Sequence, residues 1–196
     1  MLLVEQDLSG YELRECTFKD CSFEECNFAG AQLSETTFQS CNLSKCEFKH
    51  CDADEMKFVS CNLSLTSWHG SSLGDTVFDG CKLLGAQFNE IRSMHISFPR
   101  CILANSFLRN FSFRKALLEE IDFSGADLAG CDFRDAVFER CKLRDAHIVN
   151  AKFAGADLRM CDLGDLKLSN AGNFKGAIIS KDQASELLRG VGLRVF

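Results

Sequence analysis

Large apolar side chains recur at every fifth position of this chain, from Leu8 to Leu168. The spacing holds over 33 consecutive positions, and 31 of them carry a large apolar residue, with Ala53 and Ser93 as the departures. A period of five matches neither the 3.6-residue period of an α-helix nor the two-residue period of a simple strand. The pattern therefore predicts a repeat architecture in which each five residues form one structural unit.

A second series of smaller residues lies two positions before each large apolar residue. It consists mostly of Cys, Ala, Ser and Thr, and every cysteine of the chain falls on it. Residues two apart in an extended segment point the same way, so both series are expected to face a common interior. Cysteine is then expected to act as a small buried hydrophobic residue. The cysteines are Cys16, Cys21, Cys26, Cys41, Cys46, Cys51, Cys61, Cys81, Cys101, Cys131, Cys141 and Cys161.

Residues 20 apart in the sequence tend to be alike. Phenylalanine occupies positions 18, 38, 58, 78 and 98, and cysteine occupies positions 21, 41, 61, 81 and 101. If four fives complete one coil, these residues stack on one another. The sequence therefore predicts a four-faced solenoid of about eight coils.

The repeat also carries a family resemblance. SGADLAGCDF at 124–133 and AGADLRMCDL at 154–163 combine a small residue, a polar residue, Leu or Phe, and two variable residues. This pattern resembles the pentapeptide repeat family over residues 6–170. The resemblance implies an all-β fold, a right-handed quadrilateral β-helix, in residues 1–170. Residues 171–196 would then form a C-terminal cap helix and dimerisation tail.

The C-terminal end resembles a narrower group. LGDLKL at 163–168 and DQASELLRGVGLRV at 182–195 are similar to the ending of the Qnr-type proteins, a group that includes MfpA and AlbG. The resemblance implies a homodimer joined through its C-termini, which imitates duplex DNA and protects DNA gyrase or topoisomerase IV from quinolones or a similar poison. Qnr proteins usually carry two loops that interrupt the repeat. The unbroken register predicts a loopless member, with residues 89–98 as the place where a short loop could leave the coil.

A different element is expected after Leu168, where the step of five fails. Ser180 and Gln183 have the spacing of a helix capping box, and the apolar residues that follow lie on one helical face. A short helix is therefore expected to cap the open end of the solenoid. The same face and the apolar tail are also expected to form a two-fold dimer contact, which the resemblance favours. The residues assigned to that contact are Ala184, Leu187, Leu188, Val191, Leu193, Val195 and Phe196.

The cysteines and histidines do not form a pattern of catalysis or metal binding. Cysteines five apart would lie on different faces of the core, and stacked cysteines would have parallel Cα–Cβ bonds, which is poor geometry for a disulfide. The four histidines fall at outward positions, and no phosphate-binding loop or nucleophile motif is present. The sequence therefore predicts a protein that is not an enzyme and needs no cofactor or metal. The histidines are His50, His69, His95 and His147.

The chain is acidic, with 28 acidic and 22 basic residues and a net charge of −6. An acidic surface repels phosphate, so direct binding to nucleic acid is not expected. No apolar run is long enough for a membrane span, and the start MLLVEQDLSG lacks the basic segment of a secretory signal. A cytoplasmic location without membrane contact is therefore expected.

The acidic residues gather on one predicted face of the N-terminal half, where seven of them stand against Arg14 alone. A face with regularly spaced carboxylates could enter a groove that normally holds DNA phosphates. This hypothesis makes gyrase or topoisomerase IV the partner. On charge alone, a solvated face that keeps the protein soluble explains the pattern equally well. A structural or adaptor solenoid with an unrelated protein partner is the alternative function. The acidic face consists of Glu12, Glu15, Glu35, Asp52, Asp54, Glu55 and Asp75.

Overall fold

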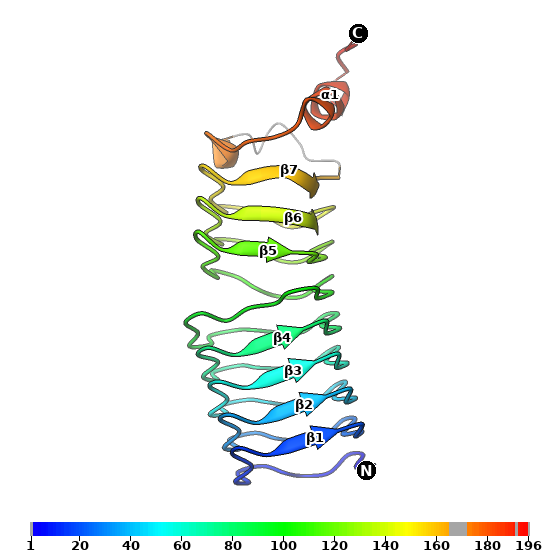
Figure 1. Ribbon diagram of the computed structural model, residues 1–196, viewed down its shortest axis with the longest axis vertical. Helices are drawn as coiled ribbons and strands as arrows, with labels where there is room; N and C mark the ends of the chain where they lie inside the picture. Colours follow the sequence, from blue (N-terminus) through cyan, green and yellow to red (C-terminus); the bar gives the residue numbers. More distant parts are fainter. Residues whose placement is uncertain (1, 165–171, 191, 196) are drawn as a thin grey trace. The chain divides into compact units, whose positions relative to one another are not determined.

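The computed structural model describes residues 2–164, 172–190 and 192–195. The chain divides into two compact units, a first unit of Met1–Phe107 and a second unit of Leu108–Phe196. Within each unit the chain winds in turns that stack on one another (Figure 1). The predicted solenoid with a short C-terminal helix is therefore confirmed.

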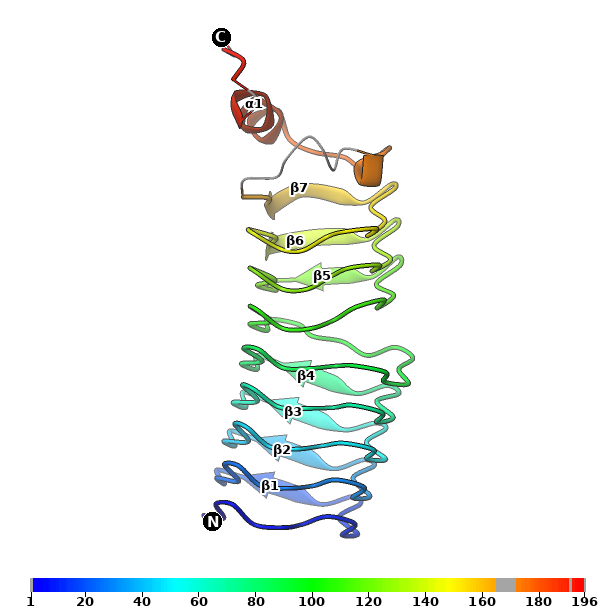
Figure 2. The ribbon, with the colours of Figure 1, turned by 180° about the vertical axis from the view of Figure 1, so that it is seen from behind.

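One face of the turns carries short parallel strands. In the first unit they pair in the order β1-β2-β3-β4, and in the second unit in the order β5-β6-β7. In the first unit, the register places each residue beside the one 20 positions later, as Phe18 lies beside Phe38. On the other faces, successive turns are joined by isolated parallel bridges such as Glu12 to Gln32. Figure 2 shows the turns of each unit from behind. The strands are β1 (Thr17–Lys19), β2 (Thr37–Gln39), β3 (Lys57–Val59), β4 (Val77–Asp79), β5 (Leu117–Glu119), β6 (Val137–Lys142) and β7 (Asp157–Asp162).

The step of five arises because each short extended segment ends in a tight turn. The last residue of the five has a positive φ even where it is not glycine, as at Glu25 (59°) and Glu35 (61°). On most faces the turn is closed by a backbone hydrogen bond, for example from the Cys26 N–H to the Phe23 carbonyl at 3.1 Å. A positive φ at the third residue is the mark of a type II turn. Each turn therefore ends one extended segment and starts the next face, and the spacing of five residues is kept.

Aromatic rings fill the interior of the first unit. Trp68 is fully buried, and its ring lies parallel to that of Phe48 with centroids 4.2 Å apart. The ring of Phe58 meets it edge-on at 5.8 Å. The Trp68 indole N–H donates to the hydroxyl of Thr66 at 3.0 Å. The core thus combines stacked rings from successive turns with edge contacts between neighbouring faces.

The small residues of the second series do more than fill space. The Cys46 thiol donates to the carbonyl of Phe23 at 2.8 Å, and the Cys51 thiol donates to the carbonyl of Phe28 at 2.9 Å. The same contact, from a side chain to the carbonyl 23 residues earlier, recurs at Thr76. Burial raises the pKa of the Cys46 and Cys51 thiols to about 12. Cysteine is therefore an architectural residue that also satisfies a backbone acceptor, a role that the sequence analysis missed.

Cysteine has a further role in the turns that follow β2 and β4. In the described structure no backbone hydrogen bond closes these two turns, and the turns after β1 and β3 lack one as well. Instead the N–H of Cys41 donates to the sulfur of Cys61 at 3.4 Å, and the N–H of Cys81 donates to the sulfur of Cys101 at 3.4 Å. The sulfur of a cysteine one turn further along the chain thus accepts from the backbone N–H that the turn leaves unpaired. At these two positions cysteine therefore serves as a hydrogen-bond acceptor as well as a core residue.

The expectation that every cysteine is buried is wrong for two of them. Ten of the twelve are buried, but Cys16 and Cys21 are half-buried. Both lie at the start of the described solenoid, where no earlier segment pairs beside Cys16 and only Leu2 and Leu3 pair beside Cys21, at Ser22. A sequence column does not show where stacking begins.

Residues 89–98 stay in register with the preceding turn. The Arg92 N–H donates to the Ser71 carbonyl at 2.9 Å, and the Ser97 N–H donates to the Thr76 carbonyl at 3.1 Å. No loop leaves the coil here, as the unbroken spacing predicted. Ser93, which departs from the large apolar series, is exposed, whereas the other departure, Ala53, is fully buried.

The stacking in the second unit continues into the C-terminal segment with a shift of one residue. The ring of Phe174 stacks on that of Phe153 at 4.4 Å, and Ile178 forms a bridge with Asp157. Partners are therefore 21 residues apart, in agreement with the late position of Phe174 in the sequence. Leu168 and the predicted boundary between residues 170 and 171 lie outside the described residues.

Helix α1 (Lys181–Gly190) begins at the predicted capping box. The Ser180 N–H donates to the Gln183 side-chain oxygen at 2.7 Å, and the Gln183 N–H donates to the Ser180 hydroxyl at 3.2 Å. The Gln183 amide also donates to the carbonyls of Leu158 and Cys161, at 2.8 and 2.6 Å. One side chain thus starts the helix and ties it to the last strand. Nothing in the described part of the chain forms a helix with the length and apolar character of a membrane span.

Candidate functional site

Four carboxylates occupy the same turn position in four successive turns of the first unit. They end their fives with φ values of 57°, 61°, 58° and 53°, and all four side chains are exposed. Because neighbouring turns pair as parallel strands do, the residues repeat at about 4.8 Å. These four residues, called the carboxylate ladder below, are Glu15, Glu35, Glu55 and Asp75.

Local stability does not account for the carboxylate ladder. Two like charges about 4.8 Å apart repel by about 1 kcal/mol in water, and a positive φ costs a non-glycine residue roughly another 1 kcal/mol. Elsewhere in this unit a basic residue at the same turn position avoids such repulsion, since Lys45 pairs with Glu25 at 2.5 Å. In the described structure no Lys or Arg pairs with the ladder, and only His95 approaches it, 3.2 Å from Asp75. The ladder is therefore an uncompensated line of negative charge.

Two other residues of the acidic face are held by neighbouring side chains. Asp52 accepts a hydrogen bond from the Ser34 hydroxyl at 2.7 Å and lies 3.4 Å from the Arg14 guanidinium. Asp54 accepts from the Ser72 hydroxyl at 2.6 Å and from the Gly74 N–H at 2.6 Å. Both aspartates are half-buried. The acidic face thus contains fixed carboxylates beside the exposed ladder, while Glu12 is exposed and has no ion pair among the described residues.

The serines that orient these aspartates were not expected from the sequence. Ser34 and Asp52 are 18 residues apart, and so are Asp54 and Ser72. In each pair, one residue follows a position of the large apolar series. The other residue precedes the position of that series that lies 20 residues further along, on the neighbouring turn. A scan for polar residues 18 apart, in addition to 20, would have found both pairs.

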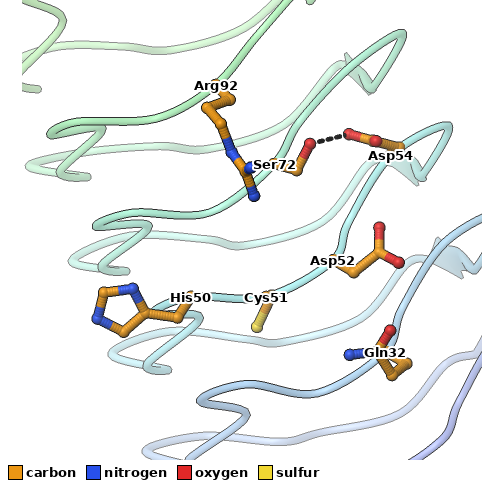
Figure 3. A pocket seen from close by; sticks show the side chains of 7 residues that line it. All are labelled: Gln32, His50, Cys51, Asp52, Asp54, Ser72 and Arg92. Carbon is orange, nitrogen blue, oxygen red and sulfur yellow. Dashed lines mark hydrogen bonds between the residues drawn. The ribbon is translucent and has the colours of Figure 1, made fainter.

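A hollow of about 480 Å³ lies beside the fixed carboxylates. In Figure 3 Ser72 lies between Arg92 and Asp54, and Asp52 lies on the same turn as Asp54, one turn before Ser72. Arg92 brings a positive charge to one end of an otherwise acidic face. The lining residues are Gln32, His50, Cys51, Asp52, Asp54, Ser72 and Arg92.

The two units differ in how their charges are balanced. Residues 1–107 contain 15 acidic and eight basic residues, whereas residues 108–196 contain 13 and 14. Described acids of the second unit are often neutralised, as Asp132 is by Arg134 at 2.6 Å. That hydrogen-bonded pair lowers the pKa of Asp132 to about 2. The negative charge available to a partner therefore belongs to the first unit.

The predicted dimerisation residues that the structure describes lie within α1 and in the segment after it. Leu188 is 38% exposed and Leu193 is 56% exposed, whereas Ala184, Leu187 and Val195 are half-buried. Val191 and Phe196 lie outside the described residues.

A backbone motif at the end of α1 brings the two exposed leucines together. The Gly192 N–H donates to the Arg189 carbonyl at 2.9 Å, the Leu193 N–H donates to the Leu188 carbonyl at 3.1 Å, and Gly192 has a φ of 85°. These are the bonds of a Schellman motif, which turns the chain back on its helix. The motif places Leu188 and Leu193 at the two positions whose apolar side chains commonly meet in it.

The titratable groups outside the acidic face are dispersed. His50, His95 and His147 are exposed and His69 is half-buried, with its ring edge-on to that of His50 at 5.5 Å. Among the residues that the structure places, no three His, Cys, Asp or Glu side chains gather as a metal site would require. Burial raises the pKa of the Cys46 and Cys51 thiols, as described above. The arrangement therefore suits charge-based recognition by a surface.

Comparisons with known proteins agree on the fold. Two trypsin-treated variants of QnrB1, described as a plasmid-mediated fluoroquinolone resistance protein, are 24% identical to this chain with TM-scores of 0.86 and 0.85. Each alignment covers 100% of this chain and 98% of the QnrB1 chain. Full-length QnrB1 is 22% identical, with a TM-score of 0.75 and coverage of 98% and 97%. At these identities the likeness shows the fold alone, and a search of curated proteins gives no match.

The repeats themselves identify the family. The sequence profile of the pentapeptide repeat region matches residues 11–88 and 91–168. Together these two matches span most of the chain. It therefore belongs to the pentapeptide repeat family.

Proposed function

We propose that this protein is a DNA mimic that binds a type II topoisomerase, DNA gyrase or topoisomerase IV, and protects it from quinolones or a similar poison. The observation that supports the proposal is the carboxylate ladder on a solenoid with the fold of QnrB1, a fluoroquinolone resistance protein. The proposed role is non-enzymatic and cytoplasmic, since it requires only that the protein meet the topoisomerase where the enzyme acts on DNA.

The physical basis of the proposal is electrostatic complementarity. A protein groove that holds DNA presents Lys and Arg side chains to a regular line of phosphates. Exposed carboxylates repeating at about 4.8 Å offer such a groove another line of negative charge. Because no Lys or Arg pairs with the ladder in the described structure, binding would not first have to break such internal ion pairs. Occupation of the groove would then disfavour the complex of enzyme, DNA and drug.

A supercoiling assay with gyrase and a quinolone tests this role. The informative variant replaces Glu15, Glu35 and Glu55 with Gln, which keeps side-chain size and backbone conformation. Asp52 and Asp54 are left intact because they accept hydrogen bonds that hold the turns. If each charge contributes about 0.5 kcal/mol or more, the variant requires about tenfold more protein for half-maximal protection.

The matched control replaces Glu119, Glu120 and Glu139 of the second unit with Gln, which makes the same change in net charge. It is expected to protect gyrase as the wild type does. If the wild type neither protects nor inhibits gyrase over a wide concentration range, the proposed function is wrong, and an adaptor solenoid with an unrelated partner is favoured. If the two variants behave alike, the ladder is not the contact surface.

We further propose that two copies associate through the end of α1. The apolar surface of Leu188 and Leu193 is exposed in the single chain, and a two-fold contact would cover it. Leu188→Asp is expected to halve the mass measured by light scattering. Leu65→Asp, at a leucine that is 60% exposed in the first unit, is the matched control and should leave the mass unchanged. A monomeric wild type would refute the dimer.

A further inference from the structure

Exposed apolar side chains form a line across three successive turns of the first unit. Leu65 is 60% exposed, Leu84 is 40% exposed and Ile102 is 37% exposed. The Leu65 N–H donates to the Leu84 carbonyl at 2.8 Å, so these two residues lie on neighbouring turns. Leu84 and Ile102 have the offset of 18 residues that brings the Ser34 hydroxyl to Asp52. Leu65, Leu84 and Ile102 are called the apolar stripe below.

Neither burial nor backbone conformation explains Leu65. It has a φ of 59°, a value that is unfavourable for a residue with a bulky side chain. Among the described residues other than glycine that have a positive φ, Leu65 is the only apolar one. Its side chain lies over the next turn at Gly85, where an added Cβ atom would come within 2.8 Å of it. Packing within the first unit therefore does not account for a leucine at this exposed turn.

The charges around the stripe favour an acidic partner. The outward positions of the two preceding turns at this corner hold three acids and one base, whereas those of the three turns that carry the stripe hold no acid. Their one charge is Lys82, which forms a bridge with Ile102, is exposed and has no ion pair among the described residues. Phe107, which is 41% exposed, adds an apolar side chain on the next face. The positions compared are 22, 24, 25, 27, 42, 44, 45 and 47 in the preceding turns and 62, 64, 65, 67, 82, 84, 85, 87, 102, 104, 105 and 107 in the later ones.

The stripe has the length of two turns of an α-helix. Successive turns of the solenoid are about 4.8 Å apart, so three turns extend the stripe by about 10 Å along the coil. Helix residues i and i+7 are about 10 Å apart as well. Apolar residues at i, i+4 and i+7 lie on one helical face, which is the face that a helix presents to an apolar surface.

We propose that the apolar stripe binds an amphipathic helix of a partner protein, in which acidic residues flank the apolar face. Apolar side chains of the helix cover Leu65, Leu84 and Ile102, and one of its carboxylates pairs with Lys82. Leu65 follows Glu55 by ten residues, or two faces of the same turn. The stripe and the carboxylate ladder therefore lie at opposite corners of the four-faced coil, and the proposal does not depend on topoisomerase binding.

Fluorescence anisotropy with the full chain and a defined peptide tests the proposal. The probe is a labelled, capped peptide of three copies of Leu-Ala-Gln-Glu-Leu-Ala-Gln, in which leucines recur at i, i+4 and i+7. Leu65→Asn is expected to weaken its binding at least fivefold, and asparagine accepts the positive φ, as Asn105 does two turns later with a φ of 57°. The matched control is Leu117→Thr in β5, where the leucine is also 60% exposed, and it should leave binding unchanged. Equal loss in both variants, or no saturable binding by the wild type, overturns the proposal.

Charge reversals separate pairing with Lys82 from general attraction. Lys82→Glu should weaken binding of this peptide at least fivefold and strengthen binding of a second peptide that has Lys in place of Glu. Lys57→Glu makes the same change in net charge at an exposed residue of β3 and should change the binding of either peptide less than twofold. Equal effects of the two reversals would refute the proposal, because binding would then follow net charge. If Leu65→Asn instead lowers the mass of the free protein measured by light scattering, the occupant is a second copy and the proposal is wrong.

A third peptide tests the helix itself. Proline in place of both alanines of the middle copy breaks the helix and keeps the leucines and glutamates. This peptide is expected to bind at least tenfold more weakly than the first. Binding as tight as that of the first peptide would show that the stripe takes an extended segment and would overturn the proposal.

Discussion

The buried hydroxyl of Thr66 offers a sharp test of the core, because it is the partner of the single tryptophan. Thr66 and Trp68 are both fully buried, and the Trp68 indole N–H donates to the Thr66 hydroxyl at 3.0 Å. The hydroxyl in turn donates to the Leu63 carbonyl at 2.8 Å. Thr66→Val keeps the shape of the side chain but removes both bonds. The indole N–H is then left in the core without a partner.

The expected cost follows from counting what each group loses. The Leu63 carbonyl keeps a longer bond from the Thr66 N–H, at 3.4 Å, so its loss is partial. The indole N–H loses its partner entirely, and an unsatisfied buried donor costs about 1–3 kcal/mol. We therefore expect Thr66→Val to lower the free energy of unfolding by about 2 kcal/mol. Thr66→Ser keeps the hydroxyl and loses one methyl group, at a cost of about 0.8 kcal/mol.

Urea unfolding monitored by tryptophan fluorescence measures both variants, because the only tryptophan is at the site itself. With an m-value of about 2 kcal/mol/M, Thr66→Val should lower the urea midpoint by about 1 M, and Thr66→Ser by less than half of that. A valine variant as stable as the wild type would refute the reasoning, since the hydroxyl would then contribute nothing. A serine variant less stable than the valine variant would show that the methyl group outweighs the hydrogen bonds.

Three further outcomes follow from other contacts. Gln183→Leu removes the acceptor of the Ser180 N–H and two bonds to the last strand, while the backbone N–H at this position keeps its bond to the Ser180 hydroxyl, so it should cost about 2–3 kcal/mol and speed amide exchange throughout α1. Gln183→Glu should keep the acceptor for Ser180 but lose both donors and turn a carboxylate oxygen toward two carbonyl oxygens. The lowered pKa of Asp132 means that its pair with Arg134 stabilises the fold above the unfolded pKa of about 4, and that this stability is lost as the pH falls toward about 2; Arg134→Ala should raise the pKa of Asp132 measured by NMR. Because only Cys16 and Cys21 are not buried, a thiol reagent followed by mass spectrometry should modify these two in the native protein, and the double serine variant should show no fast modification.

The sequence predicts most of this fold because its columns record contacts that repeat. Phe18 and Phe38 are alike because they stack, at 5.0 Å between ring centroids, and the same contact recurs in later turns. The capping box at Ser180 was predictable for a different reason, since both of its partners lie within one turn of helix. Periodic and local interactions leave a pattern in a single chain.

Contacts that break the period could not be predicted in this way. The half-exposure of Cys16 depends on where the stack begins. The stacking of Phe174 on Phe153 depends on a one-residue shift in the spacing. The sulfur that accepts the Cys41 N–H replaces a turn bond whose absence no residue type signals. On the acidic face, the sequence located the charges but could not separate held aspartates from free glutamates. Asp52 and Glu55 look equivalent in a charge count, yet one has a hydroxyl and a guanidinium beside it.

That distinction bears on how the acidic face should respond to salt. A carboxylate held by a hydroxyl, as Asp52 is by Ser34, keeps its position when ions screen it, because a short hydrogen bond depends little on ionic strength. The ladder carboxylates are exposed to solvent, and the backbone conformation of their turns does not depend on their charge. Screening therefore relieves their mutual repulsion in the free protein while it weakens their attraction to a basic groove. Both effects of salt favour the free protein over the complex. Binding through the ladder should therefore fall more steeply with salt than the number of contacts alone implies. Such steepness would separate the ladder from the fixed aspartates as the surface that a partner reads.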